Sequence, residues 1–160
     1  MSEPNPYCLA FAAEAKLFLA AYPQIAHTWS VEADESSCTL TIPAARDDGF
    51  DITITVGVGE SVITCGDFHG HEPYEDGPEE FAGHFVGFLY DLLTPLMRVR
   101  EQCAGSGAYK WTLECWRGER WEDRGTMGLL FFRYWGKRSE RIYQNHVIPL
   151  REDPLYQPEE

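Results

Sequence analysis

The chain has 160 residues, of which 44% are hydrophobic and 14% aromatic, and this composition excludes an intrinsically disordered protein. A chain of this length can bury a substantial core, so we interpret residues 1–160 as a single domain with frayed tails at 1–6 and 151–160. No uncharged apolar run approaches the ~20 residues of a membrane helix, and the first residues lack the pattern of a signal peptide. We therefore expect a cytoplasmic protein that does not bind membranes.

The formal net charge of −13 is unevenly distributed along the chain. Residues 1–97 contain 16 acidic and two basic residues, whereas residues 98–160 contain 10 acidic and 11 basic residues. A negative field repels the phosphates of nucleic acids and speeds the association of a basic partner. The charge therefore favours a basic protein partner and disfavours nucleic acid. The alternative is that the acidity serves only solubility.

Five cysteines are spread through the chain without a C-x-x-C pair, namely Cys8, Cys38, Cys65, Cys103 and Cys115. The odd number and the wide spacing are typical of neither a disulfide framework nor a zinc ribbon. We expect free thiols that fill the core as small apolar groups.

Periodicity in the first half predicts one helix and then several strands. Apolar side chains recur every three or four residues over 7–22, which predicts a helix that Pro23 ends. Alternation of apolar and polar residues predicts strands over residues 27–31, 37–43, 50–58 and 61–66, followed by a polar loop over 67–77. The short connections require antiparallel pairing.

The second half is expected to start with a long amphipathic helix from Pro78 to about Gln102, kinked at Pro95. Alternating residues then predict strands over residues 109–116, 126–135 and 140–149, with a hairpin turn at 117–120. This order predicts the α+β class, with an antiparallel β-sheet of six to seven strands and two α-helices packed on one face.

A histidine pair offers one possible site. His69 and His71 are two residues apart, so an extended backbone would direct both imidazoles to the same side. Asp67, Glu72 or His84 could complete the ligand set of a divalent metal such as zinc. This reading predicts a metal-binding protein or a small metal-dependent hydrolase. The alternative is a polar loop that binds no metal.

Other catalytic patterns are missing from the sequence, so we predict no catalytic residues and favour a protein that is not an enzyme. The chain contains no G-x-S-x-G motif, and the Gly57-Val58-Gly59 run lacks the Lys-Ser/Thr of a phosphate loop. A small ligand bound between the helices and the sheet remains a third possibility.

The segment from Glu72 to Glu80 contains five acidic residues, no basic residue and one tyrosine. Carboxylates beside an aromatic ring suit a surface lined by arginine or lysine. The predicted partner-binding residues are Glu72, Tyr74, Glu75, Asp76, Glu79 and Glu80. The alternative is a solvated loop whose last acids stabilise the start of a helix.

The predicted strands, the Gly-Asp-Phe-His-Gly-His-Glu segment at 66–72 and the following helix resemble small immunity proteins of bacterial polymorphic toxin systems. The resemblance covers about Asp51 to Val99 and leaves the tryptophan-rich second half unexplained. It implies a cytoplasmic, non-enzymatic protein that binds and inhibits a cognate toxin. Many such proteins are acidic and cover the basic site of a nuclease. We also expect no cofactor.

Overall fold

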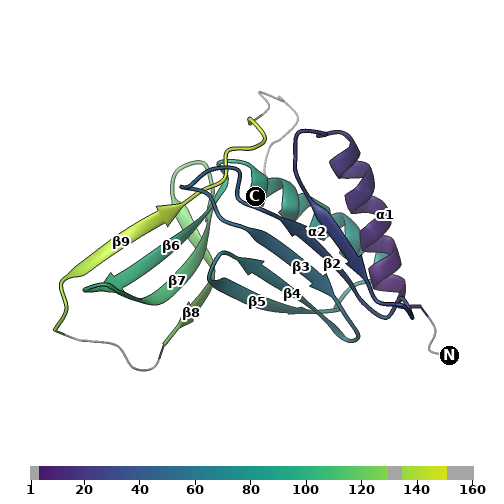
Figure 1. Cartoon of the computed structure of the whole chain (residues 1–160), viewed down its shortest axis with the longest axis horizontal. Helices are drawn as coiled ribbons and strands as arrows, with labels where there is room; N and C mark the ends of the chain where they lie inside the picture. Colours follow the sequence, from purple (N-terminus) through teal and green to yellow (C-terminus); the bar gives the residue numbers. More distant parts are fainter. Residues whose placement is uncertain (1–3, 130–134, 151–160) are drawn as a thin grey trace.

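The computed structural model describes residues 4–129 and 135–150, and it confirms the α+β class with antiparallel strands (Figure 1). The helices are α1 (Pro6–Ala20) and α2 (Pro78–Leu93). The strands are β1 (Thr28–Val31), β2 (Cys38–Ile42), β3 (Ile52–Val56), β4 (Glu60–Cys65), β5 (Phe68–Pro73), β6 (Met97–Ala104), β7 (Gly107–Trp116), β8 (Trp121–Gly128) and β9 (Arg138–Tyr143). Neither described helix is long and apolar enough to span a membrane.

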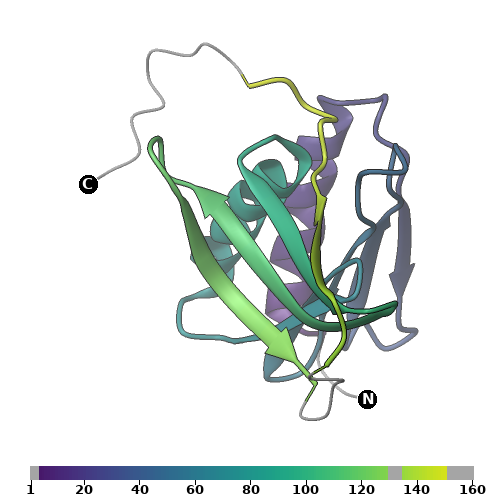
Figure 2. The ribbon, with the colours of Figure 1, turned by 90° about the vertical axis from the view of Figure 1, so that its left-hand side faces the viewer.

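The described strands form two sheets, whereas the sequence predicted one sheet of six to seven strands. The first sheet has the order β1-β2-β3-β4-β5 and the second has the order β8-β7-β6-β9. Figure 2 shows the second sheet in front of the two helices. The division falls where α2 interrupts the run of strands, since the strand after α2 pairs with β7 and β9 instead of joining β5.

One hydrophobic core joins the helices to both sheets. The alternating side chains of β2 and β3 place Leu40 and Ile54 inside, as expected for strands with one buried face. Phe11 of α1, Leu89 of α2 and Met97 of β6 belong to the same cluster, and each is at most 1% exposed. The five cysteines are free and buried, as predicted.

The start of α1 shortens the predicted tail at residues 1–6, because Pro6 is helical; residues 1–3 lie outside the described residues. Asn5 is the N-cap of α1, and its side chain accepts a hydrogen bond from the backbone N–H of Tyr7 at 3.0 Å. Its amide group also donates to the carbonyls of Ser36 and Gly57, which anchors the chain at this point. The predicted tail at 151–160 lies outside the described residues.

The predicted loop at 67–77 is wrong over residues 68–73, which form the edge strand β5. This strand pairs with β4 in continuous register, from Cys65 opposite Phe68 to Glu60 opposite Pro73. Gly66 makes the tight connection because its φ of 58° lies in the left-handed region that favours glycine. Only Phe68 of β5 is buried, so the strand lacks the alternating apolar pattern that identifies strands in a sequence.

The second predicted helix is also too long, because α2 ends at Leu93 and residues 97–104 form β6. Thr94 ends the helix in an extended conformation, as steric conflict with the ring of Pro95 favours. Pro95 therefore terminates the helix instead of kinking it. Leucines continue at helical spacing up to Leu96, so the sequence pattern did not indicate that the helix ends at Leu93.

The remaining strands are shifted from their predicted positions. The hairpin turn at 117–120 is confirmed, but β8 begins at Trp121, earlier than the predicted strand at 126–135. Residues 130–134 of that prediction lie outside the described residues. The last predicted strand, 140–149, is replaced by Arg138–Tyr143 and a segment without regular structure.

Candidate functional site

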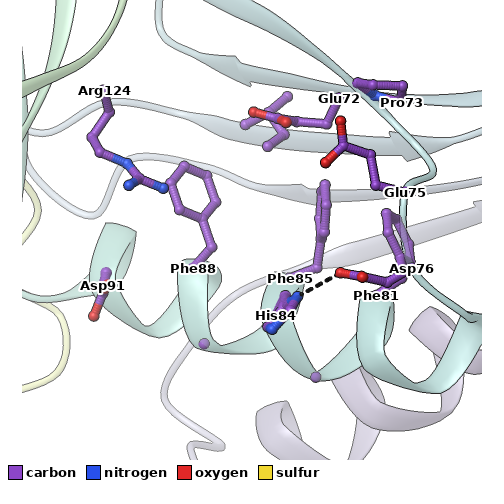
Figure 3. Close-up of a pocket in the computed structure, with 13 residues that line it drawn as sticks. Glu72, Pro73, Glu75, Asp76, Phe81, His84, Phe85, Phe88, Asp91 and Arg124 are labelled. Carbon is purple, nitrogen blue, oxygen red and sulfur yellow. Dashed lines mark ion pairs between the residues drawn. The ribbon is translucent and has the colours of Figure 1, made fainter. Parts of the chain in front are cut away.

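A surface groove of about 540 Å³ lies beside α2 and contains half of the predicted partner-binding residues (Figure 3). One wall consists of α2 residues that recur at every third or fourth position and therefore share one face of the helix. The end of β5 and the loop after it form the opposite wall, and β8 closes one end. The lining residues are Ile63, Glu72, Pro73, Glu75, Asp76, Phe81, Gly83, His84, Phe85, Gly87, Phe88, Asp91 and Arg124.

The floor of the groove is apolar and aromatic. Phe81 and Phe85 are 5% and 7% exposed, and their ring centroids are 4.3 Å apart. Phe88 is only half-buried, one helical turn further along α2. Phe88 therefore offers accessible ring surface inside a polar rim, whereas the rings of Phe81 and Phe85 are buried. Accessible apolar surface within a polar rim is the composition expected of a protein-binding surface.

Three exposed carboxylates form the rim at the N-terminal end of α2. Glu72 is held at the end of β5, where its carbonyl accepts a hydrogen bond from the hydroxyl of Ser61 at 3.2 Å. Glu75 and Asp76 follow in the loop before α2, and Asp76 Oδ2 lies 3.3 Å from His84 Nδ1. β5 and α2 thus bring Glu72, Glu75 and Asp76 to one rim.

The opposite end of the groove carries the guanidinium of Arg124, from β8. β8 reaches the groove because Gly125 allows close approach to β5, as a Cβ there would lie only 3.1 Å from Phe68 Cζ. Asp91 lies near this end, and burial raises the pKa of its carboxyl above the usual value, while Arg117 and Arg124 partly oppose that rise. The groove is therefore acidic at one end and mixed in charge at the other.

Tyr74 lies next to the acidic rim, but its side chain is used within the fold. Its ring stacks on Tyr7 with 3.9 Å between centroids and meets Phe81 edge-on. Its hydroxyl donates to the carbonyls of Gly57 and Glu60, and burial raises the pKa of this phenol. Tyr74 therefore positions the loop, and it does not line the groove.

Glu79 and Glu80 are exposed in the first turn of α2 and lie outside the groove lining. Glu80 Oε2 accepts a hydrogen bond from the backbone N–H of Gly77 at 3.2 Å. Carboxylates in this position stabilise a helix start through its free N–H groups and its dipole. Neither acid lines the groove with the three at its rim, and their predicted role in binding stays a prediction.

The structure does not bring the four candidate metal ligands together. His69 and His71 share one face of β5, as predicted, with ring centroids 5.9 Å apart. His71 Nδ1 lies 3.2 Å from Glu60 Oε2, whereas His84 pairs with Asp76 on the groove rim. Asp67 lines a different cavity. Among the described residues no group of three potential ligands is positioned to hold a metal. Metal binding stays a prediction.

That second cavity, of about 440 Å³, lies between the two sheets and was not predicted as a site. Its buried polar group is Glu101, which accepts a hydrogen bond from Trp111 Nε1 at 3.0 Å. Arg141 Nη1 lies 3.4 Å from the other carboxylate oxygen. Glu101 is thus satisfied by its neighbours, as a buried charge must be.

Sequence reasoning also missed Arg124, Gly83, Gly87 and Phe88 as groove residues. Phe88 falls on the apolar side of the predicted amphipathic helix, which indicates core packing and not a groove position. Arg124 preceded the predicted strand, and no sequence pattern indicates that β8 crosses next to β5. The two glycines carried a usable signal, because glycine is unfavourable in the middle of a helix and their spacing of four places them on one face.

Comparison of the chain with protein-family models, with curated proteins and with solved structures finds no match. The resemblance to immunity proteins therefore stays a prediction.

Proposed function

We propose that the protein is a non-enzymatic acidic binding module of the immunity type, which captures a basic surface of a toxin or nuclease in the cytoplasm. The observation that carries the proposal is the groove itself, where Glu72, Glu75 and Asp76 form the rim at one end of an aromatic floor. A lysine or arginine side chain fits such a surface because its charged end meets carboxylates while its alkyl stem covers apolar rings.

The charge distribution of the folded chain supports a cationic partner. In the second sheet, Arg98 Nε lies 2.6 Å from Glu114 Oε2 and Arg100 Nε lies 2.8 Å from Glu114 Oε1. Arg120 pairs with Glu122 in the same sheet. These guanidinium groups are engaged by carboxylates of their own sheet, so the negative charge of residues 1–97 is left to act on a partner.

The cytoplasmic part of the proposal is supported by the cysteines. All five thiols are free and buried, and burial raises the pKa of Cys65 and of Cys115. Protonated thiols in the core are unreactive, and free cysteines are typical of a reducing compartment.

The test is affinity purification of the tagged protein from its source cells, with mass-spectrometric identification of what it retains. We expect a basic protein to be enriched by the wild type and lost by the triple variant Glu72→Lys, Glu75→Lys and Asp76→Lys. Rim charges mainly set the association rate, so added salt should weaken the retention too.

The matched control makes the same change of charge elsewhere, with Glu14→Lys, Glu32→Lys and Glu119→Lys. These acids are exposed and lie outside the groove lining. Retention by the control and loss by the groove variant, with unchanged circular dichroism for both, is the expected result. Equal retention by both variants would contradict the proposal.

A further inference from the structure

Two glycines in the middle of α2, Gly83 and Gly87, lie on the groove and have no evident role inside the fold. Both are exposed, and a Cβ built on either would meet no atom within 4 Å. Neither has a positive φ, so neither conformation requires glycine. Alanine at both positions would fit the chain and would favour the helix.

Because the two glycines have no side chains, the α2 side of the groove is flat at these positions, between side chains that project from the helix. They are one helical turn apart, alongside His84 and the half-buried Phe88. Without side chains at these positions, the backbone of another segment can approach α2 closely. Helices pack through ridges and grooves of side chains, and small residues shorten the distance between their axes.

We propose that this strip docks an α-helix of the basic partner, which lies along α2 with its backbone against Gly83 and Gly87. This inference rests on the proposed function and specifies how the same groove is used. Lysine or arginine side chains of the docked helix face Glu72, Glu75 and Asp76, and an apolar side chain covers Phe88.

Charge determines which kind of helix docks in the groove and which of its ends lies at the acidic rim. A second copy of this chain is disfavoured at this rim because it carries the same net charge of −13. The positive end of a helix dipole is its N-terminus, so this end of the docked helix lies at the acidic rim. Its C-terminus then points towards Arg124, at the opposite end of the groove.

The probe is a fluorescein-labelled alanine-lysine peptide of about 18 residues, which is long enough to form a helix alone. A second peptide differs from the first only by a central proline, which breaks the helix. Fluorescence anisotropy measures the affinity of both peptides for the wild type, for Gly83→Gln with Gly87→Gln, and for the control Ala13→Gln on the exposed side of α1.

We expect the wild type and the control to prefer the helical peptide, and the double glutamine variant to lose this preference with about a tenfold weaker affinity. The double variant Gly83→Ala with Gly87→Ala should unfold at a higher temperature than the wild type and yet bind the helical peptide less tightly. A variant that is more stable than the wild type but binds less tightly cannot owe its weaker binding to a damaged fold.

Equal affinity of the two peptides, or unchanged binding by both glycine variants, would overturn the docked helix. If the rim variant Glu72→Lys, Glu75→Lys and Asp76→Lys still weakened binding in that case, the proposed function would stand without it. If neither peptide bound the wild type, both the docked helix and the basic specificity of the groove would be contradicted.

Discussion

Individual residues of the segment from Glu72 to Glu80 have different structural roles, which their sequence alone does not distinguish. Tyr74 and Glu80 are bound to neighbouring backbone groups, whereas Glu72, Glu75 and Asp76 face the groove. The composition of the segment predicted charge and an aromatic side chain. It could not predict the internal role of Tyr74, because those contacts depend on Tyr7 and Gly57, which are distant in sequence. The contact of Glu80 is local to Gly77 and matches the alternative of acids that stabilise a helix start.

The carboxyl of Asp91 gives a prediction for pH dependence. Burial raises its pKa in the folded state above the ordinary 3.8, so the folded protein binds this proton more tightly than the unfolded chain. Its contribution to stability is therefore present at low pH and is lost as the pH rises through the folded-state pKa. Asp91→Asn has no such loss.

We expect the unfolding midpoint of Asp91→Asn relative to the wild type to increase between pH 4 and pH 7. Urea denaturation at several pH values measures this difference. Glu79→Gln, an exposed carboxylate on the same helix, is the control and should show little change. A difference that is constant with pH, or that decreases as the pH rises, would refute this assignment.

At the scale of elements, the sequence predicted the strongly periodic segments and missed the weak ones. The helix predicted at 7–22, which is Pro6–Ala20 in the structure, and the strands around 40 and 54 are confirmed because their buried positions repeat with one clear period. β5 was missed because it is an edge strand with one buried residue. The boundary between α2 and β6 was missed because leucine spacing persisted across Pro95.

Asn145 connects three elements that the sequence could not place together. Its side chain accepts from the backbone N–H of Phe50 and donates to the carbonyls of Phe50 and Leu92, and it is 4% exposed. The segment after β9 is thereby joined to the entry of β3 and to the end of α2. Loss of this amide leaves buried backbone groups without partners.

We therefore expect Asn145→Ala to lower the free energy of unfolding by about 2–4 kcal/mol. Urea denaturation followed by tryptophan fluorescence provides the measurement. The neighbouring His146→Ala is the control, because His146 is exposed and its removal should change stability by less than about 0.5 kcal/mol. Similar effects of the two substitutions would show that the predicted role of Asn145 is wrong.

At the scale of the whole molecule, the uneven charge of the sequence follows the division into two sheets. Residues 1–97, which include the helices, the first sheet and the segments that connect them, contain 16 acidic and two basic residues, whereas arginines of the second sheet pair with carboxylates of the same sheet. The prediction of an acidic partner surface depended on that asymmetry. Its location at a groove beside α2 depended on packing between β5, α2 and β8, which no local pattern predicts.

The proposed function places a cationic partner at the α2 groove rather than anywhere on the acidic surface. Two-dimensional ¹H–¹⁵N NMR of the labelled protein, titrated with the helical alanine-lysine peptide, tests it most directly. We expect the largest shifts in residues 72–76 and 83–91 and near Arg124. Shifts spread evenly over exposed carboxylates such as Glu14 and Glu32, or concentrated at another site, would contradict it.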